Sequence, residues 1–307
     1  MAVASTTARL ALVTGTTSGI GAALAKQLLQ RGWEVAGVAR RKPTLENPRY
    51  HHLAVDLGDV PMAVKSIESK FGPLLGERAW QRVGLVNNAA SASLLGPVQR
   101  LDAHELVRLY AINVAIPTWL MGFVVRNSHR GAMIRIVNLS SGAAVRAFPG
   151  LAAYCGSKAA LRMAGMAFAA ELESPLRPAA TPDAAILSYE PGVVDTEMQL
   201  ATRSKSQEEF PWVETFRGFA SRRRARSSRP KSRLPRSWNF SKPTVALISS
   251  NVAAAASIMG ASRRSIEGSS HRHPSRYGTA LARSREAVRA ERGLLELLVH
   301  VVALAPS

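Results

Sequence analysis

The chain has 307 residues, a formal net charge of +19 and one cysteine, Cys155. A single cysteine excludes an intrachain disulfide and suits a reducing compartment, so we expect a cytoplasmic protein. Residues 1–8 are too short for a signal peptide, and the apolar stretch 245–259 is too short and too interrupted to span a membrane. The seven histidines show no spacing with acidic residues that would predict a metal site.

The first predicted unit is a strand, a glycine-rich turn and a helix. Residues 9–14 have the length and the Val and Leu content of a buried parallel strand, and residues 22–30 predict a helix. Glycines let the backbone approach a pyrophosphate, and the free N–H groups at a helix N-terminus favour its charge. The turn between them therefore predicts a dinucleotide-phosphate site made of Gly15, Thr17, Ser18, Gly19, Ile20 and Gly21.

Basic residues follow the second predicted strand, residues 33–39. The carboxyl end of this strand faces the adenosine ribose in a dinucleotide-binding fold, and an acidic residue there would hold the 2′-hydroxyl of NAD. The chain has Arg40, Arg41 and Lys42 instead. Because cations suit a 2′-phosphate, we predict NADP rather than NAD as the cofactor. An ordinary solvated basic loop is the alternative.

Further strands are predicted at residues 52–57, 85–87, 134–139 and 185–189. The first of them ends in Asp56 and Leu57, which places an acid where it can meet the adenine edge of the cofactor. Strands alternate with helices as far as about residue 200. We therefore predict an α/β fold, a doubly wound Rossmann-like parallel sheet, in a single domain of residues 1–219.

Tyr154 and Lys158 lie four residues apart on a predicted helix, 154–168, and Ser141 lies thirteen residues before the tyrosine. Residues at this spacing share one helix face, and an ammonium beside a phenol lowers the phenol pKa. Such a tyrosine can exchange a proton with a carbonyl oxygen near neutral pH, and a serine hydroxyl can hydrogen-bond the same oxygen. An isolated pair of this kind also occurs by accident on surface helices. Cys155 is more simply a small packed thiol.

Six motifs occur in the order and spacing of the short-chain dehydrogenase/reductase family, which the chain resembles from about residue 9 to 200. They are Thr14-Gly15-x-x-x-Gly19-Ile20-Gly21, Asn87-Asn88-Ala89, Asn113, Ser140-Ser141, Tyr154-x-x-x-Lys158 and Pro191-Gly192-Val-Val194-Asp-Thr196. The sequences around Tyr154 and after Glu190 are most similar to the sepiapterin reductase and benzil reductase branch.

The resemblance implies a role for each matching residue. Tyr154 resembles the general acid/base, Lys158 the residue that lowers its pKa and holds the nicotinamide ribose, and Ser141 the group that orients the carbonyl. Asn113 resembles the asparagine of a water-mediated proton relay, with a polar residue that satisfies a helix bend as the alternative. The implied cofactor contacts are Asn88 and Ala89 on the adenosine side, and Pro191, Gly192, Val194 and Thr196 near the nicotinamide carboxamide.

The implied reaction is the NADPH-dependent reduction of a small-molecule carbonyl compound, such as a ketone, diketone or pterin, to an alcohol. The loop after Thr196 is expected to meet the substrate, and its apolar residues favour an aromatic or bulky compound. The alternative, of equal weight, is that these side chains only cover the core. They are Met198, Phe210, Trp212 and Phe216. The alternative function is a catalytically impaired nucleotide-binding protein that acts through partner contacts. The intact Ser-Tyr-Lys set argues against it.

Residues 220–307 differ in composition, because they hold 17 of the 40 Lys and Arg residues but only 4 of the 21 Asp and Glu residues. Their arginine-rich start predicts disorder. The family normally closes with a final helix and strand, often at a dimer surface, and neither is evident. We therefore expect a homo-oligomer only if this part of the fold is intact. The segment is a basic extension, a flexible appendage or the product of an altered reading frame, which we favour; nucleic acid is not an expected partner.

Overall fold

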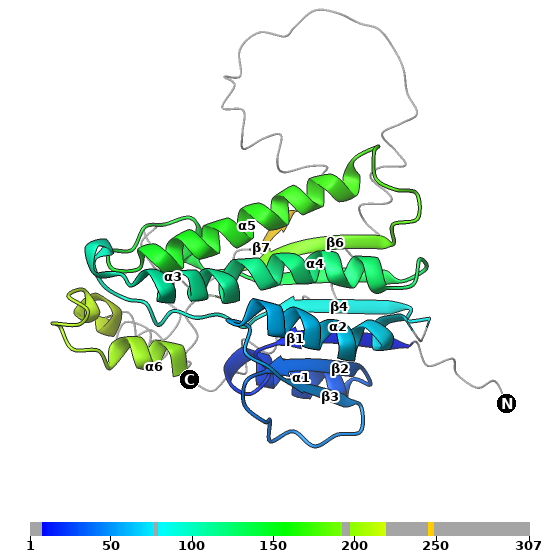
Figure 1. The fold of residues 1–307 in the computed structure, drawn as a ribbon, viewed down its shortest axis with the longest axis horizontal. Coiled ribbons are helices and arrows are strands. Elements are labelled where there is room, and N and C mark those ends of the chain that lie inside the picture. Colours follow the sequence, from blue (N-terminus) through cyan, green and yellow to red (C-terminus); the bar gives the residue numbers. More distant parts are fainter. Residues whose placement is uncertain (1–7, 77–78, 192–196, 219–244, 249–307) are drawn as a thin grey trace, which may run out of the picture.

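The computed structural model describes residues 8–76, 79–191, 197–218 and 245–248 (Figure 1). Seven strands form one sheet in the order β3-β2-β1-β4-β5-β6-β7. The first six are parallel: β1 Arg9–Thr14, β2 Glu34–Ala39, β3 Tyr50–Ala54, β4 Arg82–Asn87, β5 Met133–Leu139 and β6 Asp183–Tyr189. The predicted doubly wound parallel sheet is confirmed.

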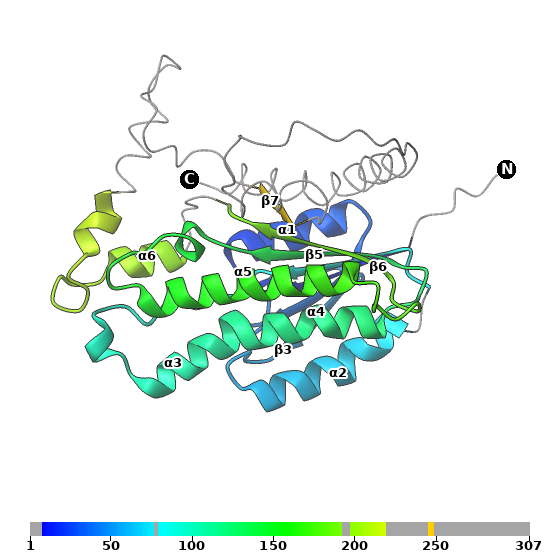
Figure 2. The ribbon, with the colours of Figure 1, turned by 90° about the horizontal axis from the view of Figure 1, so that it is seen from above.

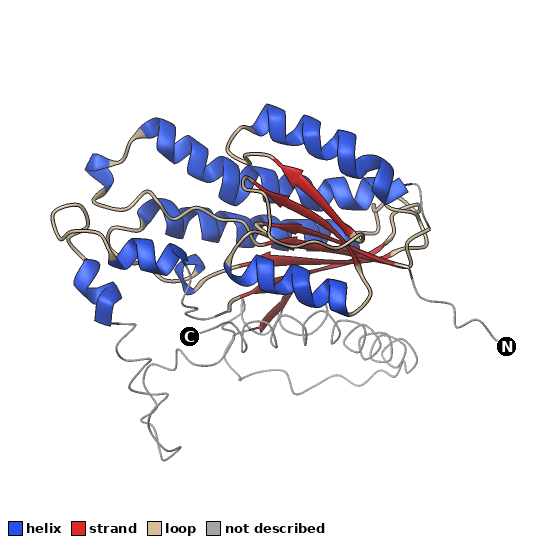
Figure 3. Cartoon of the chain, turned by 90° about the horizontal axis from the view of Figure 1, so that it is seen from below, coloured by secondary structure: helices blue, strands red, loops and turns tan. Residues whose placement is uncertain are grey.

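Helices cover both faces of this sheet. Those described are α1 Gly19–Gln30, α2 Val60–Gly76, α3 Ala103–Tyr110, α4 Ile116–Asn127, α5 Ala152–Glu173 and α6 Glu197–Arg203. Helix α1 lies on one face, and α2, α4 and α5 lie on the other (Figures 2 and 3). A π-helical turn, η2 Ala111–Ala115, joins α3 to α4, and 3-10 turns occupy η1 Val98–Arg100 and η3 Gly142–Ala144.

Burial on both faces explains why the strands are apolar without alternation. In β1, Leu10 and Leu12 belong to the core under α2 and α4, whereas Ala11 and Val13 belong to the core under α1. Successive side chains of a strand point to opposite faces, so each core takes every second residue. The carboxyl ends of the parallel strands therefore meet at one edge of the sheet, and the motif residues that follow β1, β4, β5 and β6 gather there.

Several predicted boundaries differ from the observed ones by a few residues, and two of these differences lie beside the candidate site. The third strand was expected to reach Leu57 but ends at Ala54, because the Asp56 carboxylate accepts a hydrogen bond from the Gly58 N–H at 2.8 Å and the chain turns. The first helix begins at Gly19 rather than residue 22, so the last two glycines of the turn belong to its first turn.

By length and apolar composition alone, the continuous helical stretch Ala103–Asn127 could cross a bilayer. Half of its most apolar window is buried inside the protein. Ile116, Leu120 and Val124 lie in the core against the sheet, as expected for a central helix of a globular domain. This stretch is therefore weak evidence for a membrane span.

The edge of the sheet beside β6 carries a strand that the sequence did not predict. Strand β7, Val245–Ile248, pairs antiparallel with β6, so that Val245 faces Tyr189 and Ile248 faces Ile186. These four residues come from the predicted extension 220–307, and the rest of that extension lies outside the described residues. The domain boundary and the three interpretations of the extension stay predictions.

Candidate active site

The glycine-rich turn after β1 has the geometry of a phosphate cradle. Gly15 and Gly19 have φ angles of 75° and 55°, in the region that favours glycine. A Cβ on Gly21 would lie 2.2 Å from the Gly15 carbonyl oxygen, so only glycine fits there. Ser18 caps α1 without a side-chain hydrogen bond to the first helical N–H groups. The turn therefore leaves backbone N–H groups for an anion, and these residues fit the diphosphate of a dinucleotide.

Asn88 braces this turn from the end of β4. Its Nδ2 donates to the carbonyl oxygens of Thr14 at 2.8 Å and Gly15 at 3.2 Å. In return, the Thr14 hydroxyl accepts hydrogen bonds from the N–H groups of Asn88 and Ala89, both at 3.0 Å. The amide nitrogen of Asn88 is thus used to hold β1 and β4 together.

The acid predicted to meet adenine is engaged within the protein. Asp56 Oδ2 lies 2.6 Å from Arg108 Nη2, on α3, and Asp56 Oδ1 accepts from Gly58. Burial raises the pKa of Asp56, but the hydrogen bonds from Arg108 and Gly58 outweigh it and hold that pKa below its usual value. Leu57 is buried in the core, so only its backbone can reach a ligand.

The two arginines after β2 are exposed. Arg40 lies near enough to Asp56 to contribute to its lowered pKa. Arg41 Nη2 lies 3.3 Å from Oε2 of Glu197, the first residue of α6, and the two side chains are 65% and 69% exposed. An ion pair that exposed contributes little to stability, so Arg41 can exchange Glu197 for another anion at small cost.

Tyr154, Ser141 and Lys158 lie together at the carboxyl edge of the sheet. Burial raises the pKa of the Tyr154 phenol, and a hydrogen bond with Ser141 offsets part of that rise. Lys158 Nζ lies 5.7 Å from the centre of the Tyr154 ring and donates to the Leu139 carbonyl oxygen at 2.8 Å. The lysine is 4% exposed, and burial lowers its pKa to about 8.

The direction of the tyrosine shift differs from the expectation based on sequence. An ammonium one helical turn away was expected to lower the phenol pKa, yet burial dominates and the Tyr154 pKa rises. The physical reason is that Lys158 Nζ is directed to a backbone carbonyl of β5 rather than to the phenol oxygen. The partly buried tyrosine is therefore protonated at neutral pH, with a cation held close by.

Close packing of α5 on β5 sets this arrangement. Gly165 faces the sheet, and a Cβ at that position would lie 3.1 Å from Asn138 Nδ2. Leu161 and Ala169 are buried on the same helix face. Because these small and apolar residues bring α5 close to the sheet, Lys158 can reach the carbonyl at the end of β5.

Asn113 lies in the π-helical turn η2 and is almost fully buried. Its Oδ1 accepts from the Ser91 N–H at 2.7 Å, and its Nδ2 donates to the Ser91 carbonyl at 2.8 Å and to Ser157 Oγ at 3.0 Å. Ser157 in turn donates to the Tyr154 carbonyl at 2.8 Å. The Asn113 side chain thus ties the loop after β4 to the helix that carries Tyr154. The π-helical turn that holds Asn113 is also of a kind that often occurs at functional sites.

An aromatic cluster lies against the N-terminal end of α5, which carries Tyr154. Leu151, Phe210 and Val213 are its buried members, and Tyr154 packs against them. The other residues around them are Leu95, Phe148, Cys155, Trp212 and Phe216. This cluster is separate from the two cores of the sheet. The aromatic residues therefore form a small core of their own that also contacts the candidate catalytic tyrosine.

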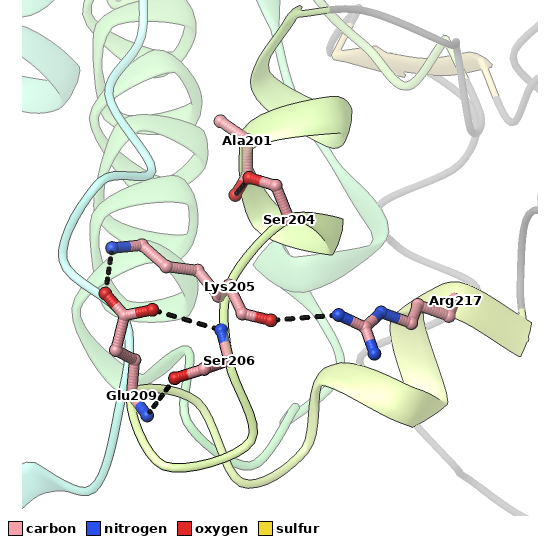
Figure 4. A network of polar contacts seen from close by, with 6 residues as sticks. All are labelled: Ala201, Ser204, Lys205, Ser206, Glu209 and Arg217. Carbon is pink, nitrogen blue, oxygen red and sulfur yellow. Dashed lines mark hydrogen bonds and ion pairs between the residues drawn. The ribbon is translucent and has the colours of Figure 1, made fainter.

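Polar contacts connect the turns of the segment 197–218 (Figure 4). Arg217 donates from Nε to the Arg203 carbonyl and from Nη2 to the Lys205 carbonyl, both at 3.0 Å. Lys205 Nζ lies 2.8 Å from Glu209 Oε1, and the other carboxylate oxygen accepts from the Ser206 N–H at 3.0 Å. These bonds fix the backbone that carries Phe210 and its aromatic neighbours.

The family model described as short chain dehydrogenase matches residues 9–207. The chain belongs to this family. It is 32% identical over 209 residues to a benzil reductase, (S)-benzoin forming, from Bacillus subtilis, which covers 68% of this chain and 84% of the relative. A solved short-chain dehydrogenase/reductase from Burkholderia vietnamiensis is 31% identical, with a TM-score of 0.56, covering 64% of this chain and 89% of that one.

A further relative is an NADPH-dependent 3-dehydrocapnine reductase from Ornithobacterium rhinotracheale, 32% identical over 169 residues, which are 50% of this chain and 56% of the relative. Members of this family use a nicotinamide dinucleotide, so the class of cofactor follows from membership. The predicted resemblance to the family is confirmed.

The structure brings most of the predicted site residues of this dehydrogenase to one edge of the sheet. Gly192, Val194 and Thr196 lie outside the described residues, and Pro191 is the last described residue before them. The sequence interpretation missed Arg108, Glu197 and Ser157, which hold Asp56, Arg41 and Asn113. No local pattern marks these residues, since each acts on a partner far away in the chain.

Replacement of Asn113 by Ala is expected to lower both stability and turnover. The change removes one buried and two partly buried hydrogen bonds and leaves the Ser91 backbone without its partner, which costs up to about 1–3 kcal/mol per unsatisfied group. We expect a clearly lower melting temperature and a fall in kcat of about tenfold or more, because α5 and the loop after β4 are no longer tied. Asn127→Ala, which removes one bond to the Phe123 carbonyl, is the control. Equal effects of the two variants would contradict a special role for Asn113.

Proposed function

We propose that this short-chain dehydrogenase reduces a carbonyl compound to an alcohol with NADPH. The observation that supports it best is the group of Tyr154, Ser141 and Lys158. The Tyr154 phenol is hydrogen-bonded to the Ser141 hydroxyl, and the buried ammonium of Lys158 lies beside the ring. A protein that only binds nucleotides has no need of this group.

The cofactor would lie along the carboxyl edge of the sheet. The turn from Gly15 to Gly21 would hold the diphosphate, and Lys158 would hold the nicotinamide ribose. The nicotinamide supplies the hydride when it is bound. The remaining cofactor contacts that the family resemblance implies are also part of this proposal. They involve Asn88, Ala89, Pro191, Gly192, Val194 and Thr196.

The chain itself supplies the proton and holds the carbonyl oxygen. Ser141 and Tyr154 are hydrogen-bonded to each other and can both donate to one oxygen atom placed between them. Tyr154 then gives its proton to that oxygen as negative charge develops on it. Its raised pKa keeps the phenol protonated at neutral pH, so the proton to be given is present. The phenolate left behind would lie beside Lys158, whose pKa of about 8 keeps it mostly cationic at neutral pH.

An aromatic ketone or diketone is the substrate class that we propose, with a pterin-like carbonyl as the second class. The relative from Bacillus subtilis reduces benzil, a diketone with two aromatic rings. In this chain the candidate acid Tyr154 packs against the cluster of Phe148, Phe210 and Trp212. Aromatic side chains next to the proton donor favour substrates with flat apolar groups.

Preference for NADPH is proposed on Arg40 and Arg41, and the relative from Ornithobacterium rhinotracheale is named as NADPH-dependent. The double variant Arg40→Ala/Arg41→Ala is expected to weaken NADPH binding by about 10- to 100-fold, the effect of losing charge-assisted hydrogen bonds to the 2′-phosphate. NADH binding should change little. Titration of each nucleotide by fluorescence measures this, with Lys26→Ala, an exposed cation on α1, as the control. Equal losses for both nucleotides would contradict recognition of the 2′-phosphate.

The function is tested by NADPH oxidation with the full chain against benzil, propiophenone and a pterin, together with NADPH binding and identification of the alcohol. Oxidation that depends on the carbonyl compound supports the proposal. Binding of NADPH without turnover of any compound would favour the alternative, a nucleotide-binding protein that acts through partner contacts. A cytoplasmic location and a homo-oligomer stay proposals; the first rests on the single cysteine.

A further inference from the structure

Glu190 follows β6 at the edge where the candidate catalytic residues gather. The Ser140 N–H donates to the carbonyl of Tyr189 at 2.8 Å. The residues that follow β5 and the residue that follows β6 are therefore neighbours. A Cβ built on Gly142 would lie 2.9 Å from Glu190 Oε1. The carboxylate therefore lies against Gly142, the residue directly after Ser141, and the missing side chain of that glycine leaves room for it.

This carboxylate differs from the other acids around the site. Asp56 pairs with Arg108, Glu197 with Arg41, and Glu209 with Lys205. Glu190 is half-buried, and within the described part of the chain no group donates a hydrogen bond to it or forms an ion pair with it. A partly buried carboxylate is stabilised by a donor, and beside a binding site the donor can come from a ligand.

We infer that, among aromatic ketones, Glu190 favours those that carry a hydrogen-bond donor, a hydroxyl or an ammonium group, on the carbon next to the reacting carbonyl over diketones, which offer only an acceptor there. The inference rests on the proposed reduction. A carbonyl oxygen held by Ser141 and Tyr154 would place the carbon next to the carbonyl toward Gly142 and the carboxylate against it. A carboxylate accepts strong charge-assisted hydrogen bonds and has no donor of its own when ionised. Glu190 is thus a specificity residue, and Tyr154 remains the proton donor.

Three ketones of nearly equal shape test this: α-hydroxyacetophenone, α-aminoacetophenone and propiophenone, which differ only in a hydroxyl, an amino or a methyl group at one position. They are assayed with NADPH in mildly acidic buffer, where the amine is protonated. The variants are Glu190→Gln, which removes the charge and keeps an acceptor, and Glu190→Ala, which removes both. Glu171→Gln removes an exposed carboxylate at the far end of α5 and is the matched control.

The native chain should prefer both donor-bearing ketones to propiophenone in kcat/KM. Glu190→Gln should lower kcat/KM for the ammonium compound by about 10-fold or more and affect the hydroxyl compound less, whereas Glu190→Ala should lower both by about 10- to 100-fold. Propiophenone reduction and the NADPH dissociation constant should stay within about twofold in both variants, which also shows that they fold. Glu171→Gln should match the native chain throughout.

Equal losses for all three ketones would assign Glu190 a structural role and overturn the inference. No preference of the native chain for the donor-bearing ketones would overturn it as well. In both cases propiophenone is still reduced by the native chain, so the proposed function stands. If the native chain binds NADPH but reduces none of the three ketones and no diketone, the proposed function fails and takes this inference with it.

Discussion

Tyr154→Phe is expected to lower kcat/KM for carbonyl reduction by about 10³-fold or more, because general acid catalysis typically contributes a factor of about 10²–10⁴ to the rate. The affinity for NADPH should stay nearly unchanged. The change removes only the hydroxyl that is hydrogen-bonded to Ser141. The ring remains, and with it the packing against Leu151 and Phe210. Stopped-flow or steady-state NADPH oxidation measures the loss, and a fluorescence titration measures binding.

The chain offers a matched control for this variant. Tyr189, on β6, is fully buried in the core on the α1 side, and its hydroxyl has no hydrogen-bond partner among the described residues. Tyr189→Phe removes a buried hydroxyl away from Ser141, so activity should remain at the native level and stability should hold or rise. Retained activity in Tyr154→Phe, or equal losses in both variants, would contradict the role proposed for Tyr154.

Gly21→Ala is expected to abolish tight nucleotide binding and to destabilise the fold. Its Cβ would lie 2.2 Å from the Gly15 carbonyl oxygen and 2.4 Å from Asn88 Nδ2. The first of these is a backbone atom of the cradle and cannot rotate away, so the turn must move. Overpacking of this kind costs about 1–3 kcal/mol. The same backbone would hold the diphosphate. We therefore expect NADPH affinity to fall by at least about tenfold, which corresponds to the loss of one charge-assisted hydrogen bond.

Gly72→Ala is the control for Gly21→Ala. Gly72 lies inside α2, and a Cβ there would meet nothing within 4 Å. Alanine should therefore leave nucleotide binding unchanged, and its gain in helix propensity of about 0.5–1 kcal/mol is opposed by the crowding of its Cβ against Pro73, the next residue. Urea unfolding and NADPH titration of both variants check this. Native-like NADPH affinity in Gly21→Ala would contradict the assignment of the turn as the diphosphate site.

Much of the fold could be predicted because its signals are local in the chain. Six parallel strands were placed within a few residues, since strands buried on both faces are short, continuous apolar runs. Strand β7 was missed. It has only four residues, pairs antiparallel at an edge and lies in a segment whose composition predicts disorder. Local composition therefore outweighed the weak strand signal there.

The candidate site was predicted as a set of residues but not as a set of contacts. Spacing along one helix was enough to place Tyr154 and Lys158 on one face, and the glycine turn was marked by its order after a strand. Asn88 was assigned to the adenosine side, whereas its side chain holds the turn. The use of that amide could not be read from the sequence, because its partners lie more than seventy residues earlier.

Local patterns were enough to predict the order of elements, the phosphate turn and the shared helix face of Tyr154 and Lys158, because helix and strand periods place residues that are near each other in the chain. Ser141 was assigned from the resemblance to the family. Three contacts became visible only in the folded chain: Arg108 pairs with Asp56, Arg41 meets Glu197, and Glu190 lies against Gly142. The tertiary structure also decided that the pKa of Tyr154 rises rather than falls. Burial and long-range pairing depend on neighbours from several strands and helices, and those neighbours exist only once the sheet has formed.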